Sequence, residues 1–323
     1  MVAAGTDAGQ GQGLAAVVNW CLPASSMARG PGAHPAGPIG EARSGAAETD
    51  EQMEESLIYR DLGDRLGQAN AFSGLGTVRL AGDYPGAAQV LGEALGIYRD
   101  LGDQHSQAEA LTYLGNARGV AGDYPGAAQV LEEAVDISRD LGDRHGQAEA
   151  LGLLGGVRQL AGDYPGAARD LQEALGISRD IGSRPLQANA LIFLGVVRRL
   201  AGNSPGAARV LEEALGIFRD IGDRGGEAEA LNEAGTLHRT RDDLRQAGSY
   251  HQQALDLARQ IGSPMDEAHA LAGLGRCALA VGHTAQAADM LRQALEILQR
   301  IGAADAPDLL AELDALTSAP PAQ

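Results

Sequence analysis

The residues that could carry chemistry are scattered along the chain and form no recognisable catalytic pattern. Cys21 and Cys277 lie far apart, and none of the seven His has a metal-ligand spacing, which favours two reduced thiols. All 25 basic residues are Arg, so a P-loop lysine and a Schiff-base lysine are excluded. Neighbouring carboxylates such as Glu132 and Glu133 diverge on a helix and predict a solvated face. We expect no enzyme activity, no cofactor and no metal site.

The charge of the chain excludes further classes of partner. Asp and Glu number 43, which gives a formal net charge of −18, whereas a nucleic-acid surface needs clustered positive charge. The apolar stretch 14–22 is too short to span a membrane, and no basic residue precedes it as a signal peptide would require. We therefore expect a cytoplasmic protein that binds neither nucleic acid nor membrane.

A period of 40 residues organises most of the sequence. The segment DYPGAAQVLGEALGIYRDLGD begins at Asp83 and returns in similar form at Asp123, Asp163 and Asn203, with degraded copies at Asp243 and His283. Each copy contains two amphipathic patterns of helical spacing, at about 107–122 and 123–142 in one copy. Pro125 fits the first turn of the second helix and Gly142 fits its C-terminal cap. Such helix pairs bury their apolar faces only by stacking on neighbouring copies, which predicts an all-α solenoid.

The small and large apolar positions of one copy resemble those of the tetratricopeptide repeat. The residues that carry this resemblance are Leu111, Leu114, Gly115, Ala127, Leu131 and Ala134. The resemblance implies a right-handed α-solenoid of antiparallel helix pairs, with about six and a half repeats of 40 residues instead of the usual 34. The whole array is similar to the C-terminal repeat arrays of actinobacterial regulators of the NB-ARC type.

The ends of the array suggest three regions. Residues 1–51 are rich in Gly, Ala, Pro and Ser and are expected to form a disordered, low-complexity segment. The solenoid is expected at 52–316, with a capping helix at about 305–316, and a disordered tail at 317–323. The array opens on half a repeat, so either residues 13–22 cap it or the chain is the tail of a longer protein. We favour the longer protein.

The resemblance also implies which residues face a partner. In this repeat family the first helix of each pair lines the concave groove, and here the inward positions of the first helices vary while the framework barely changes. The predicted partner-binding groove residues are Asn70, Glu109, Thr112, Asn116, Glu149, Asn189, Ile192, Val196, Arg199, Glu229, Asn232, Arg239, His269 and Arg276.

These positions predict a non-enzymatic scaffold that binds a protein or peptide segment in the groove. Ile192 and Val196 give the groove an apolar centre, while Arg199 and Arg239 make its next stretch basic. A helix or loop with a few acidic residues would suit such a surface. The alternative is the sensor arm of a signal-transducing ATPase or transcription regulator.

Overall fold

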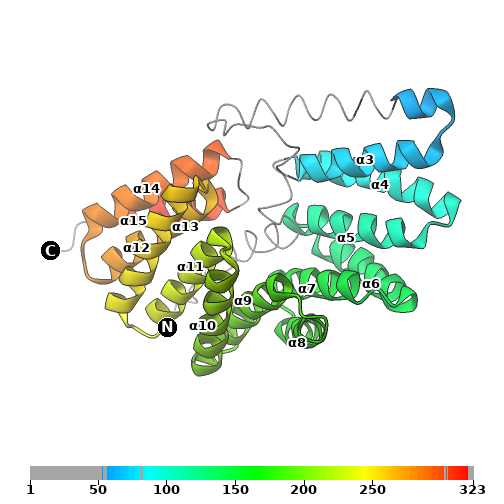
Figure 1. The fold of residues 1–323 in the computed structure, drawn as a ribbon. Coiled ribbons are helices and arrows are strands. Elements are labelled where there is room, and N and C mark those ends of the chain that lie inside the picture. Colours follow the sequence, from blue (N-terminus) through cyan, green and yellow to red (C-terminus); the bar gives the residue numbers. More distant parts are fainter. Residues whose placement is uncertain (1–52, 54–56, 81–82, 302, 304, 319–323) are drawn as a thin grey trace. The chain divides into compact units, whose positions relative to one another are not determined.

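The computed structural model describes residues 53, 57–80, 83–301, 303 and 305–318, and divides the chain within one helix into two compact units. The N-terminal unit ends at Leu186 and the C-terminal unit begins at Gln187. In the N-terminal unit, successive helices lie antiparallel and pack as pairs (Figure 1). Its helices include α3 (Arg65–Arg79), α4 (Tyr84–Leu101), α5 (Gln104–Val120), α6 (Tyr124–Leu141), α7 (Arg144–Leu160) and α8 (Tyr164–Asp180).

The C-terminal unit has the same organisation and ends on an additional helix. It contains most of α9 (Arg184–Leu200), followed by α10 (Ser204–Ile221), α11 (Arg224–Thr240), α12 (Leu244–Ile261), α13 (Pro264–Ala280), α14 (Thr284–Arg300) and α15 (Ala306–Ser318). In both units the odd-numbered helices from α3 to α13 are the first helices of their pairs, and the even-numbered helices are the second.

Short local signals begin and end most of the helices. The Asp123 side chain accepts a hydrogen bond from the backbone N–H of Gly126, and Pro125 occupies the first turn of α6. Gly142 ends α6 in the left-handed conformation, with φ of 72°, which a residue with a side chain adopts at a cost. Because the same signals recur in most copies, the helix boundaries repeat with the sequence.

Small residues let the two helices of a pair approach closely. A Cβ atom added to Gly115 on α5 would lie 2.4 Å from Cγ of Leu131 on α6, so only glycine fits against this leucine. Leu131 and its framework neighbours Ala127 and Ala134 are completely buried. The core of each unit thus repeats one arrangement, in which Leu side chains pack against Gly and Ala of the neighbouring helix.

Charged side chains link consecutive copies at the surface. Arg99 pairs with Glu133 at 2.6 Å, and Arg158 on α7 joins Glu132 on α6 to Asp170 on α8. Asp170 is buried at a position where three other copies carry Val, so its carboxylate depends on the Arg158 guanidinium.

The observed architecture is the predicted all-α class of stacked antiparallel helix pairs, and the described residues contain no strand. The N-terminal segment 1–51 lies outside the described residues. The last helix, α15, includes Thr317 and Ser318, which the sequence assigns to a tail. The Ser318 hydroxyl donates to the carbonyl oxygen of Asp314 at 2.6 Å, and Thr317 donates to that of Leu313, so both side chains bond to the helix itself.

Candidate binding surface on the first helices

All predicted groove residues lie on first helices. Asn70 is on α3; Glu109, Thr112 and Asn116 are on α5; Glu149 is on α7; Asn189, Ile192, Val196 and Arg199 are on α9; Glu229, Asn232 and Arg239 are on α11; and His269 and Arg276 are on α13. We call the side chains of these helices that point away from their own second helices the first-helix surface, and describe it separately for each unit.

Burial divides the predicted residues into two groups. Asn70 and Glu109 are exposed, and Glu149, Asn189, Glu229, Arg239 and Arg276 are partly exposed. The others are buried: Thr112, Asn116, Ile192, Val196, Arg199, Asn232 and His269. Ile192 and Val196 are each only 1% exposed, so the apolar centre that the sequence suggests is not open to a partner in this structure.

The buried polar residues of this set differ in whether and where they form hydrogen bonds. The Asn232 side-chain amide on α11 donates to the backbone carbonyl of Asp266 on α13, at 3.2 Å. The Thr112 hydroxyl donates to the carbonyl of Ala108 within its own helix. Asn116 differs, because neither its side-chain oxygen nor its nitrogen has a hydrogen-bond partner although the residue is 1% exposed. A buried side-chain amide without hydrogen-bond partners lowers the stability of the folded protein.

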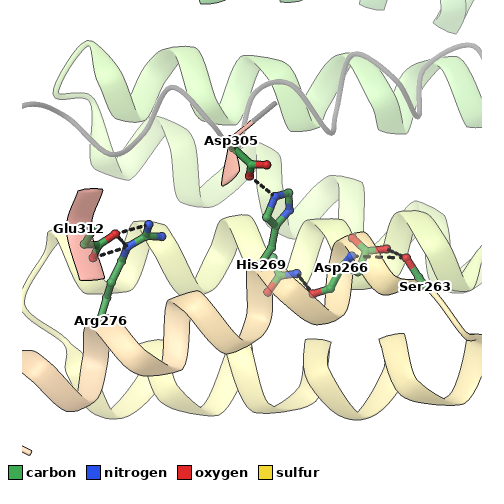
Figure 2. Close-up of polar contacts among 7 residues, drawn as sticks. Ser263, Asp266, His269, Arg276, Asp305 and Glu312 are labelled. Carbon is green, nitrogen blue, oxygen red and sulfur yellow. Dashed lines mark hydrogen bonds and ion pairs between the residues drawn. The ribbon is translucent and has the colours of Figure 1, made fainter. Parts of the chain in front are cut away.

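In the C-terminal unit, α13 is joined to α15 by two polar contacts (Figure 2). Nε2 of His269 lies 3.1 Å from Oδ2 of Asp305, just before α15 begins. The Arg276 guanidinium binds both carboxylate oxygens of Glu312 on α15, at 2.7–3.1 Å. The last helix is therefore held to α13 at two points about two turns apart, one of which depends on the protonation of an imidazole.

The environment of His269 favours its charged form. Burial alone would lower the pKa of His269, but the hydrogen bond and charge of Asp305, together with the charges of Asp266 and Glu233, raise it above its ordinary value. Burial raises the pKa of Asp266 in turn, against a hydrogen bond from Ser263 that lowers it. The raised pKa means that His269 stabilises the folded protein fully at pH values below its pKa in the unfolded chain, about 6.5. This stabilisation is lost as the pH rises through the pKa of His269 in the folded protein.

We expect Asp305→Asn to lower the pKa of His269, because burial would then oppose the charged imidazole with less compensation. The His269 ring signals followed by NMR against pH measure this directly, and amide exchange in α15 should become faster. Asp308→Asn, an exposed carboxylate on the same helix, is the matched control and should change neither quantity. An unchanged His269 titration in Asp305→Asn would show that the contact does not govern the protonation.

Three arginines lie on three successive first helices of the C-terminal unit. Arg199 on α9 is 9% exposed, and its Nη2 lies 3.8 Å from Oε2 of Glu233 on α11. Burial raises the pKa of Glu233, and this outweighs the opposite effects of Arg199 and His269. Arg239 on α11 makes no hydrogen bond or ion pair within the described part of the chain, whereas Arg276 is bound to Glu312. Burial, and then the charge of Arg276, lower the pKa of Arg239.

The carboxylates that contact the first helices in this region were not predicted from the sequence. Glu233 occupies the position of Tyr113, Leu153 and Phe193 in the preceding copies, so a comparison of framework positions would have found it. Asp305 and Glu312 belong to the segment after the last copy, where no period applies. Their contacts with α13 join residues 36 positions apart, and the sequence gives no signal for them.

The chemistry available on this surface is recognition by charge and hydrogen bonding. Among the described residues, no group of three or more His, Cys, Asp or Glu could hold a metal ion. Within the same part of the chain, no helix is long and apolar enough to cross a membrane.

Known proteins resemble this arrangement of helices. The model of the tetratricopeptide repeat family matches residues 106–180, 146–220 and 226–300, which together make up more than half of the sequence. The chain belongs to the tetratricopeptide repeat family. Its repeats of 40 residues have first helices of 17 and second helices of 17 or 18 residues across most of the array. No curated protein matches the chain.

Solved structures share the fold of this tetratricopeptide repeat protein at low sequence identity. BtubC from P. vanneervenii is 20% identical, with a TM-score of 0.53 over 73% of this chain and 93% of that chain. A Rap protein complexed with competence and sporulation factor is 14% identical, with a TM-score of 0.60 over 78% and 75% of the two chains.

A third structure is the signal transduction ATPase of the STAND class from Pyrococcus horikoshii, which has a tetratricopeptide repeat sensor. It is 17% identical, with a TM-score of 0.57, and the match covers 87% of this chain and 46% of that chain. The chain thus spans about half the length of this relative, and the likeness concerns the fold.

Proposed function

We propose that this tetratricopeptide repeat protein is a non-enzymatic, cytoplasmic scaffold that binds a protein or peptide segment in the groove lined by its first helices. One observation carries the proposal: the framework is uniform and buried, whereas accessible first-helix positions differ from copy to copy. Ala127, Ala167 and Ala207 are completely buried. One accessible first-helix position holds Glu109, Glu149, Asn189 and Glu229 in successive copies, and another holds Arg239 and then Leu279; these side chains are exposed or partly exposed.

A surface of this kind suits recognition of a particular partner. The same side chains pack at every interface between copies, which accounts for the constant framework. Packing does not account for variation at accessible positions. The Rap protein, which has the same fold, was crystallised with competence and sporulation factor, and this supports a protein or peptide partner here. The partly exposed arginines of α11 and α13 favour a segment with a few acidic residues.

Site-specific photo-crosslinking in the native host tests the proposal. A photoreactive amino acid replaces Glu109 or Asn189 on the first helices, or, as matched controls, the exposed Glu212 on α10 or Glu296 on α14. We expect one partner to be crosslinked at the first-helix positions and not at the controls. Crosslinks that concentrate at positions 212 and 296 would place the partner on the second helices and contradict the proposal.

A second candidate is the sensor arm of a signal-transducing ATPase or transcription regulator. The fold shared with the STAND ATPase, of which this chain spans about half the length, favours this candidate. In that arrangement, binding to the first helices would release an inhibited upstream domain. Sequencing the DNA upstream of Met1 distinguishes the two candidates. An open frame that encodes G-x-x-x-x-G-K-[ST] would support the sensor arm, and a ribosome-binding site directly before Met1 would support an independent scaffold.

A further inference from the structure

Residues 57–62 are helical and repeat the end of the second helices. The sequence IYRDLGD of residues 58–64 returns at residues 97–103. Its aromatic ring packs as in a later copy: a Cβ atom added to Gly67 would lie 2.4 Å from the Tyr59 ring, and one added to Gly226 would lie 2.2 Å from the Phe218 ring. Residues 57–62 therefore take the position of a second helix beside the first helix α3.

This short helix exposes large aliphatic side chains that later copies cover. Ile58 is 57% exposed, whereas none of its equivalents in later copies is exposed, and Ile177 among them is only 4% exposed. Leu62 is 74% exposed, against at most 45% for its equivalents. Leu57 is exposed at a position where later copies carry Gly, Asp or Glu. Since each copy buries its apolar surface against its neighbours, such exposure is expected where a neighbour is missing. We call Leu57, Ile58 and Leu62 the N-terminal apolar face.

One apolar run precedes this face in the chain. Residues 14–22, LAAVVNWCL, are the one stretch of residues 1–52 in which several large apolar side chains lie close together in sequence. Four of them have the i, i+3, i+4, i+7 spacing that predicts an apolar stripe on a helix, namely Leu14, Val17, Val18 and Cys21. Residues 23–56 connect this run to the face, and a chain of that length reaches up to about 110 Å, so the connection does not prevent contact.

Charge favours this segment over a second copy of the chain as the cover of the face. The formal net charge of −18 makes two copies repel each other, whereas residues 14–22 carry no charge. Arg60 and Asp61 beside the face pair with each other at 3.5 Å and offer no unbalanced charge to a charged partner. A segment of the same chain also has a high effective concentration at the face, which a separate partner lacks.

We propose that residues 14–22 form a helix that packs on the N-terminal apolar face, in the place of the first helix that would complete this pair. The contact covers the open end of the array with the chain's own segment. It also keeps the exposed aliphatic side chains from associating with other chains, which an apolar patch of this kind otherwise favours. The proposal goes beyond the proposed function, and neither depends on the other.

The rate at which iodoacetamide alkylates Cys21 in the full chain tests the proposal, because Cys21 belongs to the apolar stripe. Mass spectrometry of tryptic peptides reads Cys21 separately from Cys277, which is buried. We expect Cys21 to react about tenfold faster in Leu62→Asp, which places a charge in the face, than in wild type. Leu101→Asp is the matched control at the equivalent exposed position of the next copy, and it should change the rate less than twofold. Equal rates in wild type and Leu62→Asp would overturn the proposal.

Disulfide formation identifies which segment covers the face. Ile58→Cys places a thiol within the face, and Leu101→Cys places one at an exposed position outside it. Under mild oxidation we expect Ile58→Cys to form a disulfide with Cys21 of the same chain about fivefold faster than Leu101→Cys does. A disulfide that joins two copies at position 58 would identify a second copy as the cover and contradict the proposal. Equal rates in the two variants would likewise contradict it, because residues 14–22 would then have no preferred contact.

Discussion

Replacing His251 by Leu is expected to remove much of the acid sensitivity of the C-terminal unit. His251 on α12 is completely buried, with Nε2 unpartnered and Nδ1 3.3 Å from the side-chain oxygen of Asn232. Five other copies carry leucine at the equivalent position, namely Leu91, Leu131, Leu171, Leu211 and Leu291. Burial, followed by the charges of Arg239, Arg276 and His269, lowers the pKa of His251 from 6.5 to about 3.

The sign of the effect follows from the lowered pKa. The unfolded chain takes up a proton at His251 below about pH 6.5, whereas the folded chain does so only near pH 3, so stability falls between these values as the solution is acidified. From pH 7 to pH 4.5 this loss amounts to about 2.5 kcal/mol. Urea unfolding at both pH values should show a loss smaller by about that amount in His251→Leu than in wild type.

An exposed histidine provides the control for this comparison. His145→Leu replaces a side chain that is exposed at the start of α7, and it should show the wild-type loss between pH 7 and pH 4.5. The other buried ionisable groups are common to all three proteins and cancel in the differences. If His251→Leu were as sensitive to acid as wild type, His251 would have to be protonated inside the folded protein at pH 4.5.

Replacing Gly96, Gly176 and Gly216 together by Ala is expected to stabilise the protein by about 2–3 kcal/mol. Each glycine lies in the interior of a second helix, where glycine costs about 0.8–1 kcal/mol relative to alanine. All three are exposed, and a Cβ atom added at any of them meets nothing within 4 Å. Urea unfolding should therefore show the gain, together with a higher thermal midpoint.

The same substitution on a first helix should have the opposite effect. A Cβ atom at Gly155 on α7 would lie 2.5 Å from Cγ of Leu171 and 3.3 Å from the carbonyl oxygen of Ala167. The backbone oxygen cannot move as freely as a side chain, so Gly155→Ala should destabilise the protein by about 1–3 kcal/mol.

If the variant with alanine at positions 96, 176 and 216 were no more stable than wild type, these three positions would be covered by something that restricts a methyl group.

The fold could be predicted because the copies repeat the same local sequence signals for the ends of helices. Asp123, Pro125 and Gly142 mark the ends of one second helix, and equivalent residues mark most of the other second helices, so the 40-residue period located the helix pairs to within a few residues. The C-terminal end of α15 was less predictable, because Thr317 and Ser318 bond back to their own helix and no repeat precedes them in register.

The candidate surface was only partly predictable. Helical spacing assigned the variable residues to the first helices, but it gives the direction of a side chain and not what covers it. Ile192 and Val196 have the predicted position on α9 and are nevertheless buried. The pairing of Arg199 with Glu233 depends on two helices from different copies, and that of Arg276 with Glu312 on a helix outside the period.

Capping residues that belong to the same copy as the helix they cap affect how the number of copies can change during evolution. The second helices from α4 to α12 each take their N-terminal cap from a residue of their own copy, as α6 does from Asp123 and α8 from Asp163. Removal of residues 123–162 would join Gly122 to Asp163, so that α5 would keep its glycine stop and α8 its aspartate cap. Unequal recombination between the segments that encode similar copies can therefore shorten or lengthen this array by whole copies, and the Gly–Asp junctions that it creates repeat ones already present.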